Sequence, residues 1–168
     1  FMPGGTPWRD AATHFDATSS KTYAYVGAQG GSGTTWVLDL SSLSGDTAHG
    51  ANSNPIPSSD YKDLGYTDYA HTLNVEGGYL FLNRASGSLG CQIFELATDP
   101  MSPTKVGDTA GSGRDCHDSY FRANADGSGT DLLFSADGYD DRYRIYDVTD
   151  MSNPQSLGET EVYPGTYA

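Results

Sequence analysis

Three positions in the sequence pair a basic side chain with a polar one directly after it: Arg9 with Asp10, His71 with Thr72, and His117 with Asp118. Imidazoles and carboxylates ligate divalent cations and act as general acids and bases, so His71, His117 and Asp118 are candidate ligands of calcium or zinc. The fixed positive charge of Arg9 opposes a tight cation site. The alternative is that these groups hydrogen-bond to one another and to water, satisfying the polar ends of strands.

A second candidate metal site lies in the segment 124–131 (NADGSGTD), where Asn124, Asp126 and Asp131 place oxygen atoms at alternating positions around glycines. This spacing matches half of a calcium-binding loop, but the distal bidentate glutamate is missing. Asp-Gly is also a common hairpin turn, because glycine adopts a positive φ without strain. We favour the turn and keep the three residues as candidate ligands.

A further cluster of charges comprises Asp137, Asp140, Asp141, Arg142 and Arg144. Exposed ion pairs between neighbours of this kind contribute little to stability. We therefore expect a solvated hairpin with weak local ion pairs.

The elements that position these residues repeat along the chain. The segments 36–40 (WVLDL), 93–96 (IFEL) and 145–148 (IYDV) are similar apolar strands that each contain an acidic residue. The two later ones are followed by the turns 98–103 (TDPMSP) and 149–154 (TDMSNP) and then by a short strand. Each unit therefore predicts four short antiparallel strands.

This repeat favours an all-β fold, a β-propeller built of four-stranded antiparallel blades. We expect about three consecutive blades of a larger propeller, at approximately 8–66, 69–110 and 113–162, with 163–168 starting a further one. A β-sandwich is the main alternative, but it has no reason to repeat its strand chemistry. Three blades leave two exposed edges, so further blades or other copies are needed for closure. We interpret the chain as an excerpt with sequence on both sides.

In such a propeller the pairs that begin with Arg9, His71 and His117 start successive innermost strands and converge on the axis. We therefore expect a polar cluster at the central channel, formed by Arg9, Asp10, His71, His117 and Asp118.

Cys91 and Cys116 are 25 residues apart and fall at strand starts that share one face of the predicted fold. A disulfide between neighbouring blades would fit this arrangement, and an exported location would favour it. Two free buried thiols are the alternative.

Composition excludes several classes of function. The 168 residues carry a formal net charge of −13, which argues against a nucleic-acid partner. No apolar stretch is long enough for a membrane helix.

The order of the segments 8–10 (WRD), 69–71 (YAH), 116–118 (CHD), 145–158 and 163–167 (YPGTY) resembles the LVIVD-repeat proteins of the choice-of-anchor B family. The resemblance covers nearly the whole chain and implies a secreted or surface-attached β-propeller whose activity is largely undefined. Relative to the family pattern, the segment 41–60 is interpreted as an insertion, and no anchoring segment is present.

Two functions remain open. The first is a non-enzymatic, exported β-propeller that presents loops and aromatic rings to a protein or glycan, as a cell-surface scaffold or as a subunit of a larger assembly. No complete catalytic set is recognised, which favours this hypothesis. The alternative is a metal-assisted hydrolase or lactonase-like propeller with His71, His117 and Asp118 at the channel.

Overall fold

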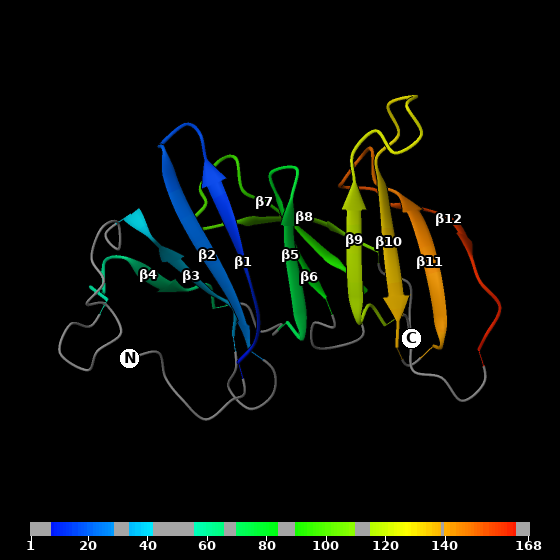
Figure 1. The fold of residues 1–168 in the computed structure, drawn as a ribbon, viewed down its shortest axis with the longest axis horizontal. Coiled ribbons are helices and arrows are strands. Elements are labelled where there is room, and N and C mark those ends of the chain that lie inside the picture. The colour runs from blue at the N-terminus through cyan, green and yellow to red at the C-terminus, as the bar shows by residue number, and fades with distance from the viewer. Residues whose placement is uncertain are drawn as a thin grey trace.

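The structure is a computed structural model that describes residues 8–28, 34–41, 56–65, 70–83, 90–109, 115–138 and 140–163. These residues form an all-β fold (Figure 1). The strands are β1 (Trp8–Asp16), β2 (Lys21–Ala28), β3 (Trp36–Asp39), β4 (Tyr61–Asp63), β5 (Thr72–Glu76), β6 (Tyr79–Asn83), β7 (Gln92–Glu95), β8 (Thr104–Asp108), β9 (Asp118–Arg122), β10 (Leu132–Asp137), β11 (Arg142–Asp147) and β12 (Gln155–Glu159).

The strands form three four-stranded sheets, and each sheet follows the chain order: β1 to β4, β5 to β8, and β9 to β12. All pairs are antiparallel. Short turns produce this order, as in the β5–β6 hairpin, where Gly77 and Gly78 have φ values of 61° and 83°. Only glycine adopts such angles without strain. The predicted four-stranded antiparallel units are thus confirmed over these three sheets.

The repeat found in the sequence is also a repeat in strand register. Val37, Ile93 and Ile145 lie on the third strand of their sheets, opposite Tyr25, Phe81 and Phe134 of the second strand. Because one register is kept in all three sheets, equivalent residues point to equivalent faces.

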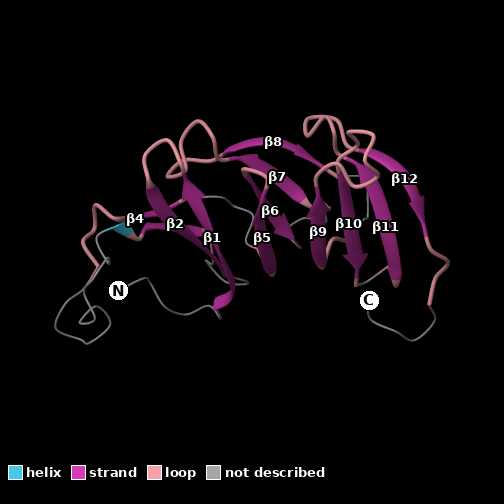
Figure 2. Cartoon of the chain, turned by 45° about the horizontal axis from the view of Figure 1, so that its top comes forward, coloured by secondary structure: helices cyan, strands magenta, loops and turns pink. Residues whose placement is uncertain are grey.

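The sheets lie side by side in sequence order, with the first strands β1, β5 and β9 adjacent to one another (Figures 1 and 2). One apolar core lies between the first two sheets and includes Tyr25, Val37, Leu73 and Phe94. A second core lies between the last two sheets. Its buried members include Phe81, Ile93, Phe121, Leu133 and Tyr146. The middle sheet therefore buries both of its faces.

Two expectations concern segments that lie mostly outside the described residues. Most of the expected insertion 41–60 and all but the first residue of the expected further strand 163–168 are not described. In the part of the chain that is described, no helix is long and apolar enough to cross a membrane.

Candidate functional site

His71 and His117, which the repeat placed at equivalent positions, are neighbours in the structure. Their ring centroids are 4.6 Å apart, with 43° between the ring planes. Each residue directly precedes the first strand of its sheet, and its backbone N–H donates to a carbonyl of the second strand, Asn83 for His71 and Ala136 for His117. The same backbone bond in two sheets brings the two imidazoles to one end of β5 and β9.

The polar residues after these positions connect neighbouring sheets. Asp10 Oδ2 accepts a hydrogen bond of 3.0 Å from the backbone N–H of Leu73. Thr72 Oγ1 donates a hydrogen bond of 2.6 Å to the carbonyl oxygen of His117. Asp118 is exposed, and its Oδ1 accepts from the backbone N–H of Ser119. Two of the three predicted pairs thus join one sheet to the next.

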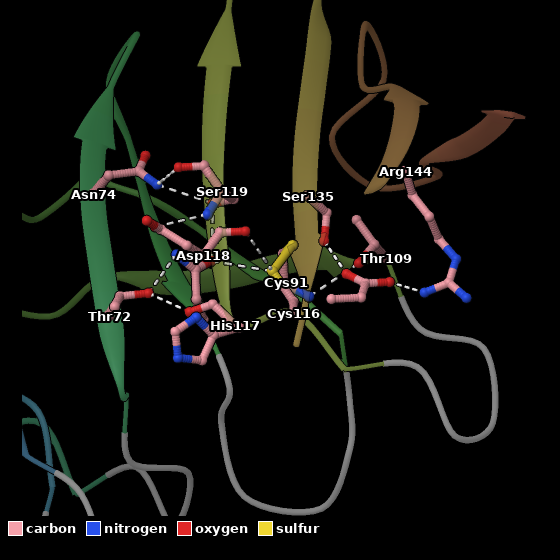
Figure 3. Close-up of a disulfide and its surroundings, with 12 residues drawn as sticks. Thr72, Asn74, Cys91, Thr109, Cys116, His117, Asp118, Ser119, Ser135 and Arg144 are labelled. Carbon is pink, nitrogen blue, oxygen red and sulfur yellow. Dashed lines mark hydrogen bonds and ion pairs between the residues drawn. A yellow bond between two sulfur atoms is a disulfide. The ribbon is translucent and has the colours of Figure 1, made fainter. Parts of the chain in front are cut away.

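Three residues that sequence analysis missed lie between the second and third sheets. Together with Thr72 they form a hydrogen-bonded row of side chains, which we call the polar seam (Figure 3). Asn83 is fully buried, and its Nδ2 donates to Thr72 Oγ1 while its Oδ1 accepts from Ser119 Oγ. Asn74 Nδ2 donates to the carbonyl and the hydroxyl oxygens of Ser119, at 2.9 Å each. For the two asparagines, the signal in the sequence was an amide side chain inside a strand.

Cys91 and Cys116 form a disulfide, with a Cα–Cα distance of 5.2 Å. Both residues are buried, between the middle sheet and the third sheet (Figure 3). Thr109 holds Cys91 in place, because its hydroxyl accepts from the Cys91 N–H and its own N–H donates to the Cys91 carbonyl. The disulfide predicted from strand positions is therefore present, and the alternative of free thiols is excluded.

The segment 124–131 forms a hairpin turn that uses its own oxygen atoms. Asn124 Oδ1 accepts from the N–H of Gly129, and Asp131 Oδ1 accepts from the N–H of Asn124. The hydroxyl and the backbone N–H of Ser128 both donate to Asp126 and hold the pKa of this carboxyl below its ordinary value. These bonds account for the three side chains as parts of a turn.

The charged hairpin differs from the expected solvated one. Arg144 and Asp137 form an ion pair in which both side chains are buried, and Ser135 Oγ also donates to Asp137. Arg144 extends the network to Asp140 at 3.1 Å and to Glu159 at 2.9 Å. Alternation along β11 turns Arg144 toward the interior, so the expectation of weak exposed pairs is wrong for Arg144 and Asp137.

Metal binding at either place stays a prediction. Among the described residues, no three His, Cys, Asp or Glu side chains lie close enough together to hold one ion. His71 and His117 are the two predicted ligands that the structure brings into ring contact.

No family model, curated protein or solved structure matches this chain.

A different candidate site lies on the face of the third sheet that points away from the middle sheet. It is a hollow of about 660 Å³ that extends over all four strands of this sheet. Its lining includes Tyr120, Phe134, Tyr143 and Ile145, and the first and third of these have 63% and 51% of their surface exposed. Exposed aromatic rings around an apolar hollow are typical of binding surfaces.

Proposed function

We propose that the chain is a non-enzymatic β-propeller-type scaffold, exported or attached to the cell surface, that binds a protein partner. The hollow on the third sheet carries this proposal, because a face of this size with exposed Tyr120, Tyr143 and Ile145 is unusual on a surface that contacts only water. The resemblance to the LVIVD-repeat proteins of the choice-of-anchor B family supports the exported or surface-attached β-propeller part of the proposal.

The arrangement of the sheets supports the propeller part of the proposal. Each sheet has the same strand order, and neighbouring sheets meet along their first strands. Blades that radiate from a common axis have this geometry. Closure of the ring is part of the proposal.

The disulfide supports an oxidising compartment, because bonds of this kind persist mainly in exported proteins.

The hydrogen bonds of the polar seam support a structural role for its side chains. Thr72, Asn74 and Asn83 use these bonds to join two sheets. These groups satisfy one another as structural groups do.

Site-specific photocrosslinking tests the scaffold. A photoreactive phenylalanine analogue replaces Tyr120 in one variant and Glu76 in another, since Glu76 is exposed but does not line the hollow. We expect a covalent adduct with a defined protein at position 120 and none at position 76. Equal or absent crosslinking at both positions contradicts a protein-binding face. A glycan array probed with the wild type and with Tyr120→Ala tests a carbohydrate ligand. Glycan binding should be lost in Tyr120→Ala if the ring stacks on a sugar.

The metal-assisted hydrolase remains a second candidate, because the rings of His71 and His117 are adjacent. The test is the metal content of the dialysed protein, by mass spectrometry, compared with a His71→Ala/His117→Ala variant. A stoichiometric ion that is lost in a folded variant supports this candidate, and a metal-free wild type contradicts it.

A further inference from the structure

We propose that a groove between the middle sheet and the third sheet binds the side chain of a lysine from a partner protein. The groove lies between described strands and shares no lining residue with the hollow on the third sheet. The two junctions between the sheets of this chain differ at this place, and the first junction contains a lysine there.

The groove has a volume of about 380 Å³ and lies where the turn between β11 and β12 packs on the middle sheet. Tyr79 of β6, Val106 of β8 and Met151 of the turn form its apolar lining. Glu95 of β7 and Asp150 of the turn add two carboxylates, and no basic residue of the described chain lines the groove. An apolar wall beside negative charges matches an alkyl chain that ends in a cation.

Both carboxylates have an oxygen atom available to a ligand. Glu95 is half-buried and accepts only from the hydroxyl of Thr98 among the described residues, at 3.0 and 3.1 Å. This hydroxyl has a single hydrogen, so it satisfies one carboxylate oxygen at a time. Asp150 Oδ1 accepts from the hydroxyl and the N–H of Ser152, and no donor in the described part of the chain reaches Oδ2. These bonds also hold the pKa of Asp150 below its ordinary value, so this carboxylate is charged at neutral pH.

The first junction shows which group belongs on the carboxylate. Asp39 and Glu95 are equivalent, because each lies on the third strand opposite a tyrosine of the second strand. Lys21 lies two residues before this tyrosine in the first sheet, and its Nζ is 2.7 Å from Asp39 Oδ2. Gly77 is at the same place in the middle sheet. Glu95 therefore lacks the ammonium group that its equivalent has.

A second difference between the junctions opens the groove. Met101 and Ser152 hold the same place in their turns, since the N–H of each donates to the aspartate two residues earlier, at 2.9 Å. Met101 packs against the first core, in which Tyr23 is 5% exposed. Ser152 is too short to do the same, and the equivalent Tyr79 is half-buried. The groove thus occupies space that the chain fills with its own side chains at the first junction.

A lysine side chain fits both features of the groove. Its methylene groups cover the apolar surface of Tyr79 and Val106. Its ammonium group donates charge-assisted hydrogen bonds to Glu95 and Asp150, and the Tyr79 ring also attracts a cation. Lysine is preferred to arginine because the ammonium of Lys21 binds the equivalent carboxylate. The net charge of −13 attracts basic segments of a partner.

An NMR titration with Nα-acetyl-lysine methylamide tests the groove. We expect saturable shifts of the backbone amides of Val106 and Ser152, with a dissociation constant of about 1 to 10 mM for a single side chain. The norleucine analogue, which lacks the ammonium group, should cause no saturable shift. No saturation by the lysine probe up to about 50 mM overturns the proposal. Equal binding of the norleucine probe, or tighter binding of the arginine analogue, also overturns it.

Two variants separate the groove from the net negative charge. Glu95→Gln should weaken binding of the lysine probe by about 5- to 10-fold, because the ammonium loses a charged acceptor. Glu161→Gln is the matched control, since Glu161 is exposed outside the groove and its replacement changes the net charge equally. Ser152→Met restores the residue of the first junction without changing the charge, and it should block binding. Equal weakening by the two glutamate variants, or unchanged binding in Ser152→Met, contradicts the groove.

Zero-length crosslinking tests whether the lysine belongs to a partner protein. A carbodiimide activates the Glu95 carboxyl, and a lysine amine held against it displaces the activating group and forms an isopeptide bond. We expect mass spectrometry to map a bond between Glu95 and a lysine of one defined protein of the source cells, present in wild type and absent in Ser152→Met. A wild type with no such bond overturns the partner. Failed crosslinking at Tyr120 would refute binding at the hollow and leave the groove unaffected, because the two share no residue.

Discussion

Asn83 is the residue on which the seam between the middle and third sheets depends most. It is fully buried, donates to Thr72 and accepts from Ser119. We expect Asn83→Ala to lower the free energy of unfolding by about 2 kcal/mol, because it leaves buried partners without hydrogen bonds. Urea unfolding measures the loss. Asn153→Ala, in an exposed turn, is the control, and the same small change in both variants would contradict a structural role for the seam.

The hydrogen-bonded carboxyl of Asp39 predicts that the stability of the fold depends on pH. Burial acts to raise the pKa of Asp39, but the hydrogen bond from Lys21 Nζ at 2.7 Å and those from Ser41 outweigh it, so its pKa lies below the ordinary value. A lowered carboxyl pKa stabilises the fold above the ordinary value, near 4, and this contribution disappears as the pH falls through the lowered pKa.

The pKa of Lys21 is raised by the same hydrogen bond, so its contribution is lost only when alkaline pH passes through the raised value. We expect the difference in melting temperature between wild type and Asp39→Asn to be present at pH 7 and to vanish toward pH 2. Thermal melts across this range measure it, and a constant difference would contradict the assignment.

Those parts of the candidate site that follow from the positions of the repeated strands could be predicted from the sequence. Equivalent sequence positions were sufficient to bring His71 next to His117, and strand starts on a shared face were sufficient to bring Cys91 next to Cys116. Asn83 could not be predicted, because its role depends on a partner in another sheet. The buried pairing of Arg144 depends on which face of β11 turns inward, and charge alone does not indicate that.

Among the elements, the fourth strands β8 and β12 allow a matched comparison of two glycines. A methyl group on Gly107 would overlap the carbonyl oxygen of Met151, whereas one on the equivalent Gly158 would meet no atom within 4 Å. We expect Gly107→Ala to cost about 2 kcal/mol or more and Gly158→Ala to change stability by less than about 0.5 kcal/mol. Chemical denaturation of both variants measures this, and equal effects would show that β8 does not pack tightly on the third sheet.

The disulfide links two elements that no strand pairing connects. Its loop spans 25 residues, for which the loss of chain entropy corresponds to about 3 kcal/mol. We expect Cys91→Ser/Cys116→Ser to lower the free energy of unfolding by about this amount. Denaturation of the variant and of the reduced wild type should agree. A reduced protein as stable as the oxidised one would contradict the expectation.

At the scale of elements, sequence patterns predicted the third strand of every sheet and the short strands β8 and β12. The repeat spacing was sufficient because register, turn and apolar face recur together. It could not indicate which apolar side chains pack between successive sheets, since this packing depends on side-chain shape on both sides.

For the whole molecule, the net charge of −13 predicts a response to salt. Repulsion among the excess carboxylates opposes the compact state, and ions screen it. We expect the melting temperature to rise between about 10 and 200 mM NaCl, by roughly 3 °C for each kcal/mol of repulsion removed. Calorimetry at several salt concentrations measures the trend, and a falling melting temperature would mean that attractive ion pairs dominate.

Both apolar cores between the described sheets include residues of the middle sheet, so the middle sheet is the common neighbour of the other two. Stability in such an array resembles a one-dimensional chain of coupled units, in which only nearest neighbours interact. Fraying should then start at the outer units and reach the centre last. Amide hydrogens of Leu80 and Leu82 should exchange with solvent more slowly than those of the outermost strands, and a substitution in the middle unit weakens two couplings at once.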